Sequence, residues 1–316
     1  MRASGPLDAK GQPMLPSEPE ILDYLARVDA LYPDRAGSAT VTERRRIYEA
    51  MCDAFKVPRP EGVTASDDAV TDGGRTIPVR TYRRAGAGTA AAILWIHGGG
   101  FVVGSLDSHD SICADICGAT GAPVVAVDYR LAPEHTGLDD HEDCWAVFRH
   151  LAGQGRGIVL AGDSAGANLA AGVALRARDE GSDAAVGQAL VYPELGGDTS
   201  VGSYVEMADA PGLATADIRD FRKTRAAPGD DARAWPLRAA DLTGLPPTFV
   251  TAARFDPLRD DGRAYASRLA SAGVNVYFRE EPQMVHAWLR ARHSSPGARS
   301  AFDALCAALA GMAGRR

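Results

Sequence analysis

The chain has 316 residues, of which 46% are hydrophobic and 24% charged, and its formal net charge is −7. This length and composition predict one substantial globular domain with a smaller appendage. The negative charge gives no general attraction to nucleic acid or to anionic membranes. No segment approaches the roughly 20 apolar residues of a membrane span, and the first residues lack the apolar core of a signal peptide.

The five cysteines are an odd number and form no CxxC pair, which argues against a disulfide framework and fits a reducing compartment. We therefore expect a cytoplasmic protein.

Two helices are predicted before residue 56. Ser17 and Glu20 fit a capping box, and apolar residues at helical spacing follow them. A second helix is predicted from Thr40, with Glu43 in the matching position of a capping box.

Further along, apolar strand-like segments alternate with helical ones, which predicts a parallel sheet wrapped by helices. The predicted strands are 75–83, 92–96, 123–127, 158–161, 188–192, 248–251 and 274–278, and the predicted helices are 108–118, 144–151 and 168–178. Residues 196–235 lie between two strands and lack a strand pattern, as is typical of a lid or binding element. We expect this insertion and the N-terminal helices to form a cap over the C-terminal edge of the sheet, where open α/β sheets bind ligands.

A G-x-S-x-G motif at 162–166 follows the predicted strand 158–161 and precedes a helix that begins near Asn168. A strand, a sharp turn and a helix make a nucleophile elbow, which lifts a serine hydroxyl above the sheet. Ser164 is therefore the predicted nucleophile.

Attack on an acyl carbon creates an oxyanion that needs preorganised donors. The N–H group of Ala165, directly after the nucleophile, is one candidate. The HGGG segment at 97–100 supplies the others, because it follows a strand as the oxyanion loop of lipases and esterases does. His97 is predicted to shape this loop by hydrogen bonding, not to act as a base.

A general base and its orienting acid should follow the nucleophile in the order Ser, Asp, His. Asp256 and His286 fit, because each follows a predicted strand and therefore lies at the same sheet edge as Ser164. Pro257 disfavours a helical conformation at Asp256 and keeps it outside the following helix. Asp260 and Asp261 fall in the first turn of that helix, where its positive end explains them without catalysis.

The acidic run around His141, residues 139–143, could suggest a metal site. Consecutive ligands cannot all converge on one ion, so we interpret the run as a polar helix start and predict no metal. Cys113 and Cys117 share a helix face, and we interpret them as small core residues and not as a metal or redox pair.

Together these segments resemble the bacterial hormone-sensitive-lipase family of esterases, also called family IV. The matching segments are HGGGF at 97–101, VDYRLAPEH at 127–135, GDSAGANLA at 162–170, DPLRDDG at 256–262 and MVHAW at 284–288. The resemblance implies the α/β-hydrolase fold, with a mostly parallel eight-stranded sheet, flanking helices and a helical cap. It implies cap helices in 1–55, a catalytic domain in 56–195 and 236–316, and a cap insertion at 196–235.

Carried over by motif, the catalytic residues are Ser164, Asp256 and His286, and the oxyanion donors are the N–H groups of Gly99, Gly100 and Ala165. Phe101 and Trp288 are the substrate-binding residues expected near the site. Residues 128–130 with Glu134 and His135 resemble the family's structural turn.

The reaction implied is hydrolysis of short-chain acyl esters through an acyl-enzyme, with no metal or cofactor. Amidase, deacetylase and lactonase activities remain open on the same machinery. A non-catalytic ligand-binding protein of this fold is disfavoured because all three triad residues are present. The expected partner is a small-molecule ester, not nucleic acid or a membrane, and a homodimer remains open.

Overall fold

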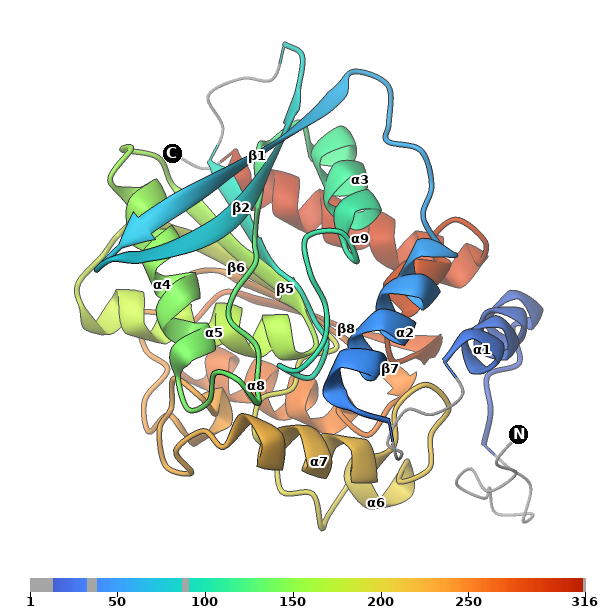
Figure 1. The fold of residues 1–316 in the computed structure, drawn as a ribbon. Coiled ribbons are helices and arrows are strands. Elements are labelled where there is room, and N and C mark those ends of the chain that lie inside the picture. The colour runs from blue at the N-terminus through green and yellow to red at the C-terminus, as the bar shows by residue number, and fades with distance from the viewer. Residues whose placement is uncertain (1–13, 33–38, 87–90, 315–316) are drawn as a thin grey trace.

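The computed structural model describes residues 14–32, 39–86 and 91–314. An eight-stranded sheet runs through these residues in the order β1-β2-β4-β3-β5-β6-β7-β8 (Figure 1). The strands are β1 (Val63–Asp72), β2 (Arg75–Arg84), β3 (Ala92–Ile96), β4 (Val124–Val127), β5 (Ile158–Asp163), β6 (Ala185–Val191), β7 (Thr248–Phe255) and β8 (Val276–Val285). The pairs β1–β2 and β2–β4 are antiparallel, and all the others are parallel, so the predicted fold class is confirmed.

Helices cover both faces of the sheet. Because side chains alternate along a strand, β3 directs Ile93 and Trp95 to one face, and Leu94 and Ile96 to the other. The helices α3 (Asp110–Thr120) and α9 (Pro296–Ala313) pack on the first face, and α4 (Asp139–Ala152), α5 (Ala165–Asp179) and α8 (Arg259–Ser271) pack on the second. Burial on both faces explains why the central strands read as continuous apolar runs.

The remaining helices come from the N-terminal segment and from the insertion between β6 and β7. They are α1 (Pro19–Leu31), α2 (Val41–Asp53), α6 (Ser203–Glu206) and α7 (Thr215–Arg225), and two short 3₁₀ turns lie at Pro236–Arg238 and Trp288–Ala291. In Figure 1 the blue α2 stands beside the end of the gold α7, and Arg44 of α2 pairs with Asp220 of α7 at 3.3 Å. The two segments therefore adjoin one another.

The first helix does not start as predicted. Ser17 is not its cap, because the helix begins at Pro19 and the Ser17 N–H and hydroxyl both donate to Gln283 Oε1. Proline favours the first helical position, since its missing N–H needs no partner there. The second helix is capped as predicted, with Thr40 Oγ1 accepting the N–H of Glu43.

No pattern in the sequence predicted β1. Of its ten residues only Val63 and Val70 are buried, because β1 is an edge strand that pairs with β2 alone. Such an edge has no apolar alternation to detect, and its acidic side chains protect it from pairing with another chain.

The acidic run at 139–143 begins α4, as predicted. Asp140 pairs with Arg225 at 2.7 Å, and Asp143 pairs with Arg130 at 2.7 Å. Among the described residues no group of three His, Cys, Asp or Glu side chains could hold a metal ion.

All five cysteines are unpaired and buried. In the described part of the chain, no helix is both long enough and apolar enough to cross a bilayer.

Candidate active site

Three side chains from three strand ends meet at the C-terminal edge of the sheet. Ser164 follows β5, Asp256 follows β7 and His286 follows β8. His286 Nε2 lies 3.0 Å from Ser164 Oγ, and His286 Nδ1 lies 2.7 Å from Asp256 Oδ2. Asp256 is fully buried, and its Oδ1 accepts the N–H of Leu258 at 2.8 Å. The three predicted residues therefore form one hydrogen-bonded chain.

The turn at Ser164 is strained and tightly packed. Ser164 has φ 54° and ψ −119°, a conformation that a residue other than glycine rarely adopts. A Cβ atom on Gly166 would lie 2.0 Å from the carbonyl oxygen of Ile96, so only glycine lets α5 approach β3 this closely. This geometry is that of a nucleophile elbow, with the serine at the N-terminal end of α5.

The neighbouring acids, Asp260 and Asp261, accept hydrogen bonds from other groups. Asp260 accepts the N–H of Ser203 at 2.8 Å, and Asp261 accepts two N–H groups of the loop 195–197. Both lie in the first turn of α8, as predicted. The positive end of α8 is not the whole explanation for an acid at position 261, because the Asp261 carboxyl group also holds the start of the insertion. Asp256 alone of the three contacts His286.

Three residues beside Ser164 carry backbone N–H groups that could serve as oxyanion donors. Gly99, Gly100 and Ala165 all line the pocket, and no described acceptor takes a hydrogen bond from their N–H groups. Ala165 is the first residue of α5, where helical N–H groups lack an internal partner. Gly99 has φ 134°, and a Cβ atom there would lie 2.0 Å from the Val103 carbonyl oxygen. The loop therefore requires glycine and leaves its donors available.

Buried polar groups hold this loop in place. The Gly98 N–H donates to Asp163 Oδ1 at 3.0 Å, and His109 Nε2 lies 3.3 Å from the same oxygen. Burial alone would raise the pKa of Asp163, but His109 first, and then Arg290 and the Gly98 N–H, keep this pKa below its ordinary value. His97 Nδ1 donates to the Gly98 carbonyl at 2.9 Å, and its ring stacks on Tyr129.

Burial first, and the neighbouring His109 second, lower the pKa of His97 to about 3, so its ring is neutral at neutral pH. These contacts agree with the loop-shaping interpretation of His97. Sequence reasoning missed the contribution of Asp163, although its place inside the G-x-S-x-G motif was a usable signal.

A pocket of about 1030 Å³, counted to its open mouth, lies above these groups. Helices outside the central layers supply its far wall, with Tyr24, Leu25 and Val28 from α1, Tyr48 from α2, and Ile218 and Phe221 from α7. Phe101 lines the pocket as expected. Trp288 does not, because its ring is fully buried beneath the site, edge-on to Tyr192 at 5.9 Å.

A family model described as the α/β-hydrolase fold matches residues 93–290. The chain belongs to this family. Carboxylesterase NlhH of Mycobacterium tuberculosis is 39% identical over 266 residues, which cover 79% of this chain and 82% of that protein. Ethyl acetate hydrolase of Pseudomonas putida is 32% identical, over 86% of this chain and 92% of that protein.

Solved α/β hydrolases agree in structure. An ester hydrolase from the metagenome of Lake Arreo, complexed with a derivative of bipyridine phosphonate, aligns with a TM-score of 0.86 and 32% identity. The alignment covers 96% of this chain and 100% of that chain. A mutant of the esterase rPPE aligns with a TM-score of 0.88 and 26% identity, over 97% of this chain and 100% of that chain. Within the α/β hydrolases, the chain is an enzyme of the hormone-sensitive-lipase group, family IV, of serine carboxylesterases.

Proposed function

We propose that this α/β hydrolase cleaves carboxylic esters with Ser164 as nucleophile, His286 as general base and Asp256 as the acid that orients His286. The observation that carries the proposal is the unbroken chain of contacts from Asp256 through His286 to Ser164, at 2.7 and 3.0 Å. Because Asp256 accepts from Nδ1, the hydrogen of neutral His286 lies on Nδ1 and Nε2 is left to accept the Ser164 proton.

The proposed reaction has two halves. Ser164 attacks the ester carbonyl as its proton passes to His286, and the N–H groups of Gly99, Gly100 and Ala165 stabilise the oxyanion. His286 then protonates the departing alcohol, which leaves an acyl group on Ser164. Water, deprotonated by His286, attacks the acyl-enzyme and releases the carboxylic acid.

We also propose that the acyl group is short. Two similar proteins are named ethyl acetate hydrolase and acetyl-hydrolase, the second being a Streptomyces hygroscopicus protein that is 34% identical. Phe101 and the helices α1, α2 and α7 line the pocket around Ser164 and limit its room. A panel of 4-nitrophenyl esters tests this proposal, and we expect kcat/KM to be highest for acetate to butyrate and to fall for longer chains. Equal turnover on long-chain esters would contradict it.

We further propose a location and partners for the protein. A cytoplasmic location accords with five buried, unpaired cysteines, since thiols stay reduced in that compartment. The proposed partner is a small ester, and a homodimer stays a prediction that the mass of the protein in solution would test.

Covalent labelling tests the nucleophile directly. A 4-nitrophenyl phosphonate should inactivate the enzyme with release of one equivalent of 4-nitrophenol, and peptide mass spectrometry should place the adduct on Ser164. An adduct on another residue, or turnover that survives complete labelling, would overturn the assignment.

A further inference from the structure

The buried arginines of the described residues differ in whether they have a carboxylate partner. Five arginine side chains are buried, and four of them pair with a carboxylate. The pairs are Arg44 with Asp220 at 3.3 Å, Arg225 with Asp140 at 2.7 Å, Arg292 with Asp115 at 2.7 Å, and Arg259 with Glu206 and Asp260. Only Arg290 has no carboxylate oxygen within 4.0 Å among the described residues.

The partners of Arg290 are neutral. Its Nη1 donates to the Ser108 carbonyl oxygen at 2.9 Å, and its Nη2 donates to the Tyr48 hydroxyl at 3.0 Å. A guanidinium group carries five N–H donors, so these two bonds leave several of them without a described acceptor. Its positive charge therefore lies in the interior without a paired counter-charge.

Arg290 also lies in the wall of the substrate pocket, which it shares with Ser164, His286 and Tyr48. The four paired arginines do not line this pocket. The unpaired buried cation is thus the one that lines the pocket.

The other charged groups of the pocket wall are already engaged. Arg222 pairs with Glu194 at 2.9 Å, and Asp217 accepts the Ala214 N–H at 3.0 Å. Asp163 attracts Arg290 at longer range, but its oxygens are taken by the Gly98 N–H, His109 and the Tyr192 hydroxyl.

A buried charge without a counter-charge is costly, and the cost is relieved when an anion binds beside it. Arginine suits a carboxylate in particular, since its planar fork matches the two oxygens. We propose that Arg290 binds a free carboxylate on the substrate, so that the enzyme prefers esters whose acyl or alcohol part ends in a carboxylate. This inference rests on the proposed function, because Ser164 must cleave the ester that Arg290 holds.

The chemistry of the proposed reaction is ordinary hydrolysis. One water is consumed, the bond between the acyl carbon and the alkoxy oxygen breaks, and the alcohol leaves with a proton. The carboxylate bound by Arg290 takes no part in bond making and is released unchanged. Its position on the acyl or alcohol side decides which product carries it.

Two matched substrate pairs test both sides. For the acyl side, monoethyl glutarate is compared with ethyl 5-oxohexanoate, in which a methyl ketone replaces the carboxylate. For the alcohol side, 4-acetoxybutanoate is compared with 5-acetoxypentan-2-one. Acid release by the whole chain in a pH-stat gives kcat/KM for each substrate. In one of the two pairs we expect the carboxylate substrate to exceed its ketone partner by about tenfold or more, as for a charged hydrogen bond.

Variants of Arg290 test whether this residue causes the preference for a carboxylate. Arg290→Gln should lower the carboxylate-to-ketone ratio by about tenfold or more, and Arg290→Lys should retain part of it, because the charge stays and the fork is lost. Arg299→Gln, on the exposed side of α9, changes the net charge equally and should leave the ratio in place. If Arg290→Gln does not fold, the wild-type ratios and Arg290→Lys decide.

The outcomes separate this inference from the proposed function. Ratios at or below one in both pairs overturn the carboxylate site, as does a ratio that persists in folded Arg290→Gln. If Arg290→Gln lowers kcat/KM equally for both members of a pair, Arg290 only holds α2 against Ser108. That result would also overturn the carboxylate site. If no ester is cleaved and the phosphonate does not label Ser164, the proposed function itself has failed.

Discussion

The two walls of the pocket are built in different ways. The inner wall comes from strand ends, where short contiguous motifs place Gly99, Ser164 and His286 directly above the sheet. The outer wall comes from α1, α2 and α7, whose side chains reach the pocket from segments far apart in the chain. The comparison indicates that the predicted catalytic residues are encoded by local motifs, whereas the outer wall depends on packing between segments far apart in the chain.

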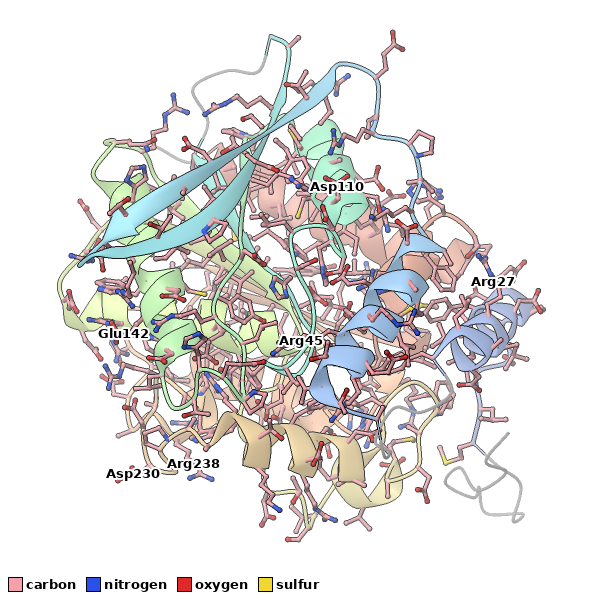
Figure 2. The ribbon with its side chains drawn as sticks, viewed as in Figure 1. Arg27, Arg45, Asp110, Glu142, Asp230 and Arg238 are labelled. Carbon is pink, nitrogen blue, oxygen red and sulfur yellow. The ribbon has the colours of Figure 1, made fainter. Side chains whose placement is uncertain are left out.

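The two walls also contact one another. The guanidinium carbon of Arg225, at the end of α7, lies 3.8 Å from the centre of the Phe101 ring, at the end of the glycine loop 97–101. From α2, Arg45 donates to the Val102 carbonyl at 2.8 Å and pairs with Glu134 at 2.7 Å, and Figure 2 shows it beside these loops. The outer wall therefore supports the inner wall, and substitutions in each wall should differ in the size and kind of their effects.

The largest loss of turnover is expected in the inner wall. Ser164→Ala should lower kcat by at least about 10⁴-fold, because no other group can form the acyl-enzyme. Circular dichroism and the unfolding midpoint should stay near those of the wild type. A folded variant with more than a few per cent of wild-type turnover would show that Ser164 is not the nucleophile.

The next loss is expected from the orienting acid. Asp256→Asn should keep the shape of the site but favour the wrong His286 tautomer, with a cost in kcat of about 10⁴. Asp260→Asn, four residues along, is the matched control and should cost far less, because Asp260 binds Ser203 and two arginines. Asp256 is not the orienting acid if Asp260→Asn loses most of its kcat while the kcat of Asp256→Asn stays within about tenfold of wild type.

These inner-wall residues could be predicted because their signals are local. Ser164, Asp256 and His286 each follow an apolar strand, so strand order and sheet geometry were enough to bring them together. Trp288 shows the limit of this reasoning, since a 3₁₀ turn at Trp288–Ala291 sends its ring into the core. The same turn places Arg290 in the pocket wall, which nothing in the segment 284–293 indicates.

For the outer wall, the sequence indicated which segments would form it but not their contacts. Its helices were expected in 1–55 and 196–235, yet the ion pair of Asp140 with Arg225 joins residues 85 positions apart. Charged residues of this kind look like solvated helix faces in a sequence. Only the packing of α7 against the loop 97–101 shows that Arg225 is buried.

A smaller loss of turnover is expected where the cap supports the inner wall. Arg225→Met should lower kcat by about tenfold to 10²-fold with little change in KM, because the oxyanion loop shifts while the pocket stays open. Arg225→Lys should recover part of kcat, since it keeps a charge beside Asp140. Arg219→Met, on the exposed side of α7, is the control and should match the wild type. A change in KM alone would mean that Arg225 only shapes the pocket.

The smallest effect on turnover is expected at Asp261, whose contribution is to stability. Burial first, and the charge of Glu194 second, raise the pKa of Asp261 to about 7, from an ordinary value of 3.8. Between about pH 4 and pH 7 the folded protein therefore holds a proton that the unfolded chain has released. The free energy of unfolding should fall as the pH rises through this window, by up to about 1.4 kcal/mol per pH unit from this group.

Asp261→Asn removes this pH dependence while its amide oxygen can still accept the N–H groups of Leu195 and Gly197. Urea unfolding at pH 5 and at pH 7.5 should show the variant gaining stability relative to wild type at the higher pH. Asp260→Asn is the matched control. Although burial opposes it, the Ser203 N–H and Arg259 lower the pKa of Asp260, so its stabilising effect is lost only as the pH falls below about 4. That control should therefore differ from wild type by the same amount at pH 5 and pH 7.5. If the stability difference between Asp261→Asn and wild type is also the same at pH 5 and pH 7.5, then Asp261 is ionised over this whole range and holds the insertion as a charged group.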